Sequence, residues 1–154
     1  MCSSDLITQH MPPGFTASFA RRMNDQCAVT VIEAKDGSPV RRGHVYVAPG
    51  ARHLEIATKG GEFVCRLHDA APVSGHRPSV DVLFKSVADV VGADALGIIL
   101  TGMGRDGAVG LLAMRERGAR TLGQSEGSCL IYGMPRVAKE IGADRKSTRL
   151  NSSH

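Results

Sequence analysis

The chain has 154 residues, of which 42% are apolar and 22% are charged, and its formal net charge is +4. A chain of this length and composition is expected to form one globular domain with a sizeable core. No apolar run reaches membrane-spanning length, and no block of Lys and Arg with interleaved aromatic residues is present. Composition therefore gives no support to membrane insertion or to nucleic-acid binding.

The four cysteines are widely spaced and form no CxxC pair; they are Cys2, Cys27, Cys65 and Cys129. Structural zinc sites use closely spaced ligand pairs, so no metal site is predicted. Free thiols buried in a protein of a reducing compartment explain this pattern best. We therefore expect a cytoplasmic protein.

The two ends of the chain, residues 1–6 and 144–154, carry no apolar periodicity. Both resemble the translated adapter text that recurs at the ends of assembled genes. We expect them to be a non-native leader and tail, with residues 7–143 as the biological domain. Native tails without order are the alternative.

The first predicted helix follows a Pro-Pro turn. Phe15, Phe19 and Met23 recur at helical spacing, which predicts a short amphipathic helix. His10 lies just before the turn. A single histidine is more often structural than catalytic, but its side chain titrates near neutral pH and suits proton transfer.

Four short strands are expected next, over residues 28–34, 44–48, 53–58 and 62–67. Tight turns join the last three, which favours a small antiparallel meander. His44, His53 and His68 lie in or beside these strands without the spacing of metal ligands. We expect these three histidines to be surface or packing residues.

The second half of the chain alternates helices with apolar strands. Apolar side chains recur at helical spacing over residues 80–91, after Ser79 as a candidate N-cap. The later elements are a buried strand over 95–100, a helix that Gly118 ends, a buried strand over 119–122 and a helix opened by Pro135. This alternation predicts a parallel sheet with helices on its faces, to which the meander adds an antiparallel edge.

The most informative stretch is the Gly-rich turn between the strand and helix around residue 100. It contains Gly102, Gly104 and Gly107, with Asp106 at the mouth of the helix. Ligands bind at the carboxyl ends of strands in open α/β sheets, and a helix N-terminus offers free N–H groups. Asp106 could serve as a simple helix cap. A phosphate-binding loop is a further interpretation, although neither GxGxxG nor GxxxxGK[ST] is present.

Five stretches of the chain together resemble one family. They are QHMPPGF at 9–15, VYVAPG at 45–50, GHRPSVD at 75–81, LTGMGRDGA at 100–108 and YGMP at 132–135. In this order they are similar to the catalytic domain of the chemotaxis protein-glutamate methylesterases, the CheB family. The resemblance covers about residues 7–143. It implies a doubly wound three-layer α/β sandwich with a mostly parallel sheet, of which the first βαβ unit is missing here.

The resemblance also implies a reaction. Members of the family hydrolyse glutamate γ-methyl esters on methyl-accepting chemoreceptors and release methanol, and many also deamidate receptor glutamines. They use a Ser-His-Asp triad and neither a metal nor an organic cofactor. A receiver domain often precedes the catalytic domain and regulates it by phosphorylation. The partners implied are thus the chemoreceptors and, in a longer protein, an upstream receiver domain.

Residues of this chain match the family's site position by position. His10 matches the catalytic histidine, and Asp106 matches the aspartate that orients the imidazole and stabilises its cation. The backbone N–H of Met103 matches an oxyanion-hole donor. Gly102 and Gly104 flank this donor, so the backbone can approach the ester carbonyl.

His76 and Arg77 lie in a polar loop between patterned elements. Loops carry function more often than cores do. We predict that both residues contact the substrate, and a solvated turn is the alternative.

The family's nucleophile has no counterpart here. It lies in a strand followed by a Ser-Thr-Gly-Gly turn upstream of the histidine, whereas only nine residues precede His10. Ser3 and Ser4 have no such setting. Because a triad without its nucleophile keeps only the residual rate of binding and the oxyanion hole, we expect the chain to be nearly inactive by itself.

A non-catalytic α/β module that binds a receptor or an anion is the competing hypothesis. A phosphate site would present Lys, Ser or Thr at the helix mouth, whereas this chain presents Asp106. The sequence thus favours the esterase over anion binding.

Overall fold

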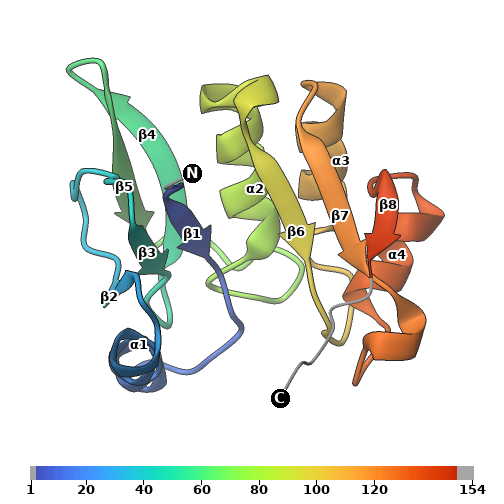
Figure 1. The fold of residues 1–154 in the computed structure, drawn as a ribbon, viewed down its shortest axis with the longest axis horizontal. Coiled ribbons are helices and arrows are strands. Elements are labelled where there is room, and N and C mark those ends of the chain that lie inside the picture. The colour runs from blue at the N-terminus through green and yellow to red at the C-terminus, as the bar shows by residue number, and fades with distance from the viewer. Residues whose placement is uncertain (1–2, 149–154) are drawn as a thin grey trace. The chain divides into compact units, whose positions relative to one another are not determined.

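A computed structural model of the chain describes residues 3–148 (Figure 1). The chain forms two compact units, one ending at Leu83 and the other beginning at Phe84. The boundary falls inside helix α2 (Val80–Val90). Strands alternate with helices in the second half of the chain, as the sequence predicts, and most strand pairs are parallel.

A parallel sheet organises the first unit. Its strands, in the order β1-β3-β2, are β1 (Asp5–Ile7), β3 (His44–Val47) and β2 (Thr30–Glu33). The central strand is the most buried, with Tyr46 and Val47 almost without exposed surface. The Tyr46 hydroxyl donates a hydrogen bond to the Pro39 carbonyl at 2.7 Å. This bond satisfies the one polar atom of a buried aromatic ring.

Helix α1 (Phe15–Gln26) begins just after the Pro-Pro turn, as predicted. The core of this unit is built from Ala20 of the helix and from Val31, Val45 and Val47 of the sheet, with Phe19 and Met23 packed against it. Burial of one such valine contributes roughly 1.5–3 kcal/mol. The spacing of Phe19 and Met23 thus places the apolar side of the helix on the sheet.

The first turn of α1 is also tied to the sheet by a buried hydroxyl. Thr16 donates to the Glu33 carboxylate at 2.6 Å and accepts the Gly50 N–H at 3.0 Å. One threonine therefore joins the start of the helix to the ends of β2 and β3.

Strands β4 (His53–Lys59) and β5 (Glu62–His68) form an antiparallel hairpin. Gly60 and Gly61 both have positive φ, at 60° and 81°, as a two-residue hairpin turn of type I′ requires. The predicted three-stranded meander is wrong, because β3 pairs in parallel with β1 and β2 instead. Its apolar run Val45–Val47 is buried throughout, which is typical of a parallel strand.

The second unit contains a parallel sheet in the order β6-β7-β8. Its elements after α2 are η1 (Gly92–Asp94), β6 (Leu96–Ile99), α3 (Ala108–Glu116), β7 (Arg120–Gln124), η2 (Glu126–Ser128), α4 (Met134–Glu140) and β8 (Lys146–Thr148). Strands β6 and β7 and helices α3 and α4 follow the predicted elements closely, and α4 contains Pro135 in its first turn. Strand β8 and the short helices η1 and η2 were not predicted. Strand β8 and the first residues of β1 use parts of the two end segments, whose foreign origin stays a prediction.

The expectation that β6 is fully buried is wrong. Gly97 and Ile99 are buried, whereas Leu96 is 50% and Ile98 46% exposed. A Cβ on Gly97 would lie 2.7 Å from Cδ1 of Leu111. The glycine therefore lets α3 pack directly on one face of β6, and a continuous apolar run in the sequence hides the alternation of the two faces.

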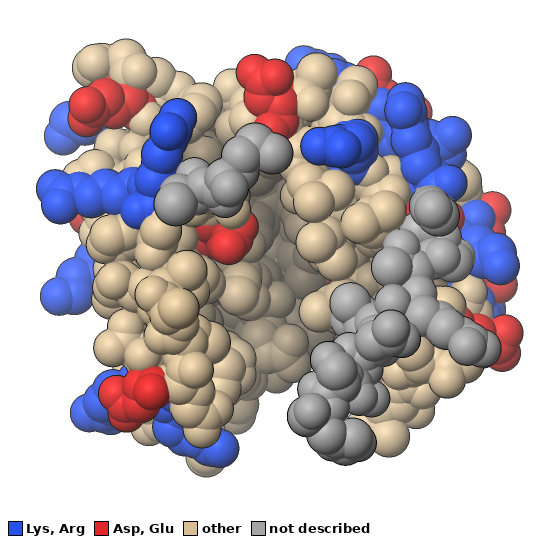
Figure 2. Space-filling view, viewed as in Figure 1, with Lys and Arg blue, Asp and Glu red and all other residues tan. Residues whose placement is uncertain are grey.

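No helix within residues 3–148 is long and apolar enough to span a bilayer. On the face shown in Figure 2, basic and acidic side chains are interspersed over both units.

Candidate active site

His10 lies in the loop between β1 and α1, at the carboxyl end of a parallel strand, where α/β proteins place their ligands. It is half-buried. Main-chain bonds shape the loop: the Met11 N–H donates to the Gln9 carbonyl at 2.9 Å, and the Phe15 N–H donates to the Pro12 carbonyl at 3.3 Å. The imidazole is thus carried by a short, internally bonded segment.

The same loop rests on Gly50, at the end of the VYVAPG motif. A Cβ on Gly50 would lie 2.4 Å from the Pro13 nitrogen and 2.6 Å from the Pro12 carbonyl carbon. Such a close approach of two backbones is possible only at a glycine. The second motif therefore helps to place His10, although the two are far apart in the sequence.

His76 is the neighbour that the structure brings to His10. The two imidazole rings are stacked, with centroids 3.6 Å apart and planes within 6° of each other. His76 ends a tight turn in which it exchanges both main-chain hydrogen bonds with Val73, at 2.9 and 3.0 Å. Ser74 and Gly75 have φ of 51° and 79°, as in a type I′ turn.

Arg77 is engaged with the main chain of its own loop. Its guanidinium donates to the carbonyls of Asp69 and Ala70, at 3.1 and 3.3 Å. This geometry assigns Arg77 a local bracing contact. A contact of His76 or Arg77 with substrate stays a prediction.

His53 holds the loop that carries His76, a role that the sequence did not indicate. It is fully buried. Its Nδ1 accepts the Ser79 N–H at 3.1 Å, and its Nε2 lies 3.0 Å from the Ala71 carbonyl, to which it can only donate. His53 is therefore a packing residue, as expected, but one with both nitrogens committed to the loop of His76. No sequence pattern signals this role, because its partners are main-chain atoms.

The Gly-rich turn of the second unit lies between β6 and α3, as predicted. Gly107, in a left-handed conformation with φ of 92°, is the residue at which the chain enters the helix. The interpretation of Asp106, one residue earlier, as a helix cap stays a prediction. Asp106 itself is fully buried. A buried carboxyl group is costly unless polar groups surround it.

The turn is held by the segment that precedes α4. The Thr101 hydroxyl donates to the Ile131 carbonyl at 3.1 Å and accepts the Ile131 N–H at 2.8 Å. The Gly102 N–H donates to the same carbonyl at 3.1 Å, and the Gly102 carbonyl accepts the N–H groups of Gly133 and Met134. The fifth motif, YGMP, thus fixes the backbone of the fourth.

Gln124 clamps the same region, a role that the sequence did not suggest. Its Oε1 accepts the Thr101 N–H at 2.7 Å, and its Nε2 donates to the Ser128 carbonyl at 2.7 Å. The side chain is 8% exposed. The sequence indicated only a polar stretch after a strand.

Met103 lies in the middle of this turn, and its side chain is 76% exposed. Its N–H makes no hydrogen bond within the part of the chain that the structure describes. Gly102 and Gly104 flank it, and Gly104 has φ of 92°. A rigidly held N–H of this kind suits a developing oxyanion. The oxyanion role of Met103 and its flanking glycines stays a prediction.

The candidate residues fall into two groups. His10, His76 and Arg77 belong to the first unit, and Met103 and Asp106 belong to the second. The pairing of His10 with Asp106 therefore remains a proposal.

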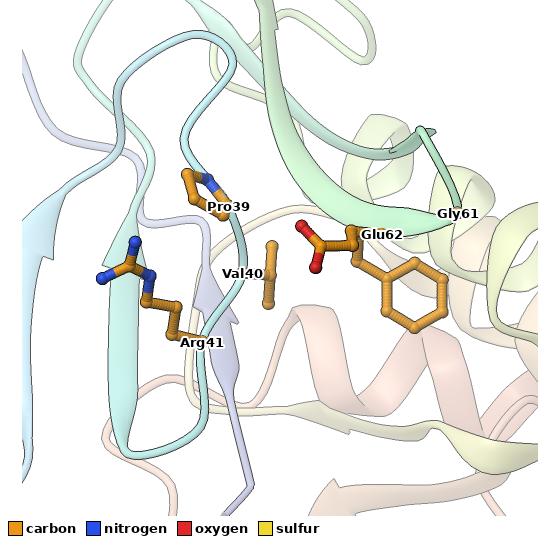
Figure 3. Close-up of a pocket in the computed structure, with 6 residues that line it drawn as sticks. Pro39, Val40, Arg41, Gly61 and Glu62 are labelled. Atoms are coloured by element: carbon orange, nitrogen blue, oxygen red, sulfur yellow. The ribbon is translucent and has the colours of Figure 1, made fainter.

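The rest of the described chain holds no metal cluster and one pocket of note. Within residues 3–148, no three His, Cys, Asp or Glu side chains gather as metal ligands. A pocket of about 380 Å³ opens in the first unit between the segment before β3 and the β4–β5 turn (Figure 3). The Glu62 carboxylate turns toward Val40, and the Arg41 guanidinium points away from it. No candidate catalytic residue lines this pocket.

Known proteins resemble this chain in sequence and in structure. The CheB methylesterase family matches residues 3–152. A protein-glutamate methylesterase/protein-glutamine glutaminase of Rhizobium etli is 62% identical over 143 residues, which are 92% of this chain and 41% of the relative. A protein of the same name from Pectobacterium atrosepticum is 60% identical over 137 residues, which are 89% of this chain and 39% of the relative. The chain thus spans about two fifths of the length of these relatives.

The structural comparison agrees with the sequence comparison. The crystal structure of the Thermotoga maritima CheB methylesterase catalytic domain matches with a TM-score of 0.93 and 33% identity, over 96% of this chain and 78% of that structure. The α/β fold predicted from the five motifs is therefore confirmed. With a family match over nearly its whole length, this chain belongs to the CheB methylesterase family.

Proposed function

We propose that this chain provides the histidine, aspartate and oxyanion-hole parts of a cytoplasmic protein-glutamate methylesterase. The substrate is the γ-methyl ester of a glutamate on a methyl-accepting chemoreceptor. The observation that carries the proposal is the braced Gly-rich turn, where a main-chain N–H at Met103 precedes the fully buried Asp106. The high identity to proteins named as methylesterases supports the same reaction.

In this mechanism a serine supplied by an upstream segment attacks the ester carbonyl. His10 accepts the serine proton, and the Met103 N–H stabilises the negative oxygen of the tetrahedral intermediate. The carbon–oxygen bond to methoxide then breaks, and His10 returns the proton so that methanol leaves. Water repeats the sequence on the acyl-enzyme and frees the glutamate. One oxyanion donor is worth about 2.7–4 kcal/mol of barrier, and Asp106 keeps His10 in the correct tautomer.

Deamidation of receptor glutamines would follow the same path, with ammonia as the leaving group. The relatives carry this activity in their names. A receiver domain in the longer protein is the proposed regulatory partner, because the chain matches only part of the relatives' length.

The test is methanol release from methylated chemoreceptor. The 154-residue chain is compared with a version preceded by the corresponding upstream segment of the Rhizobium etli relative. We expect activity only in the extended chain. Asp106→Asn in that chain should lower kcat by about 10⁴-fold, the order of magnitude known for loss of a triad aspartate.

Circular dichroism and cooperative unfolding serve as the controls for folding. A folded extended chain that releases no methanol would contradict the proposal. If that inactive chain still bound the receptor, a non-catalytic module would be favoured instead.

A further inference from the structure

The loop over residues 69–79 is held far more firmly than a solvated turn needs to be. Arg77 donates to two carbonyls at its start, and His53 holds it through Ala71 and Ser79. Val73 and His76 close the tip with a pair of main-chain bonds. The buried His53 side chain and the exposed Arg77 side chain thus both use their hydrogen bonds to fix this loop.

The turn presents an imidazole to another imidazole. The His76 ring covers the His10 ring at 3.6 Å between centroids and 6° between planes, which is van der Waals contact over the whole face. A ring held in this way cannot rotate about its Cβ–Cγ bond without driving its edge into the neighbour. Rotation about an sp³–sp² bond has broad minima, so the stack narrows the range of orientations that the His10 ring can take.

We propose that His76 is a positioning residue for His10: its ring, fixed by the braced loop, sets the plane in which the His10 nitrogens lie. This inference rests on the proposed function for the role of His10 as the base. It differs from the substrate contact predicted for His76 from the sequence. A histidine base must point one nitrogen at the nucleophile and the other at the orienting acid. A fixed ring plane therefore orients both nitrogens together.

Orientation of this kind acts on the rate of the chemical step. A small misplacement of a catalytic group lowers the rate by about 10²-fold, because the reacting atoms leave their attack geometry. Loss of the stack should therefore lower kcat and leave KM unchanged. A lost substrate contact would raise KM instead.

Substitutions of His76 distinguish the effect of a flat aromatic face from the effect of a titratable imidazole. His76→Phe keeps an aromatic face without a titratable nitrogen, His76→Leu fills a similar volume without a flat face, and His76→Ala removes both. His44→Ala is the control, since His44 also bonds a main-chain carbonyl, that of Arg42, at a distance from this loop.

The first measurement uses the 154-residue chain itself and needs no activity. Proton NMR follows the ring signals of His10, assigned with His10→Gln. A stacked ring shifts the protons of its neighbour upfield. We expect these signals to move downfield in His76→Ala and His76→Leu, and to stay near their original positions in His76→Phe and His44→Ala. Unchanged His10 signals in His76→Ala and His76→Leu would overturn the proposal.

The second measurement uses the extended chain. We expect kcat for methanol release to fall by about 10- to 100-fold in His76→Leu with KM unchanged, and to return to within a few-fold in His76→Phe. A rise in KM with kcat preserved would overturn the proposal in favour of a substrate contact. A Phe variant as slow as the Leu variant would show that the imidazole itself takes part.

The experiments distinguish a failure of the esterase proposal from a failure of the proposed role of His76. If the folded extended chain releases no methanol with His76 intact, the esterase proposal fails. The NMR comparison still decides whether His76 stacks on the His10 ring. If His76→Ala does not fold, the Leu and Phe variants carry the same comparison.

Discussion

Gly50→Ala should displace the loop that carries His10. Gly50 does not have the positive φ at which a side chain is strained, so alanine meets only a steric obstacle. Its Cβ would lie 2.4 Å from the Pro13 nitrogen and 2.6 Å from the Pro12 carbonyl carbon. Carbon atoms in contact sit about 3.5–4.0 Å apart, so one of the two backbones must move by about 1 Å.

The expected effect follows from these distances. Insertion of a methyl group into a packed site costs about 1–3 kcal/mol. For a chain of this size, 1 kcal/mol corresponds to a fall in Tm of about 2–4 °C. Because the loop that moves carries His10, kcat of the extended chain should also fall by about 10²-fold.

Gly127→Ala is the matched control for this change. Gly127 also lacks a positive φ, but a Cβ there has no neighbour within 4 Å. Thermal unfolding of both variants, with methanol release in the extended chain, makes the comparison. Equal Tm values and equal kcat for the two variants would refute the argument that Gly50 places the loop of His10.

Two further predictions concern the second unit and the cysteines. Gly133→Ala should lower kcat of the extended chain more than Gly102→Ala does. The new Cβ at residue 133 would lie 2.5 Å from a main-chain oxygen, whereas a Cβ at residue 102 meets the flexible Met134 side chain. Steady-state methanol assays measure both variants, and equal losses of kcat would contradict the prediction. Burial raises the pKa of the Cys65 thiol to about 11, so at neutral pH iodoacetamide should label exposed Cys27 well before Cys65. Mass spectrometry of the labelled peptides measures the order, and labelling at equal rates would show that Cys65 is accessible.

The elements of the fold could be predicted well from the sequence, because their signals are local. Helical spacing of Phe15, Phe19 and Met23 predicts α1, and the glycines after β6 predict the turn before α3. Strand pairing could not be predicted in the same way. The Pro49–Gly50 turn after β3 indicates that the chain reverses, but not which strand becomes its neighbour.

In the candidate site too, only the features with a local sequence signal could be predicted. Its candidate catalytic residues stand in recognisable motifs, so His10 and Asp106 could be proposed from the sequence. The groups that hold them are invisible there, because His53 and Gln124 bond mostly to main-chain atoms whose positions only the fold determines. The stack of His76 on His10 likewise joins residues that no local pattern connects.

The hydrogen bonds of His53 have a practical consequence. A main-chain N–H faces its Nδ1 and a carbonyl faces its Nε2, so the proton must reside on Nε2 as long as the loop is in place. Tautomers of histidine are distinguished by the nitrogen chemical shifts of the ring. The labelled ring of His53, whose two nitrogens bond main-chain atoms, therefore reports whether the loop beside His10 is docked or released, in the resting protein and during turnover alike.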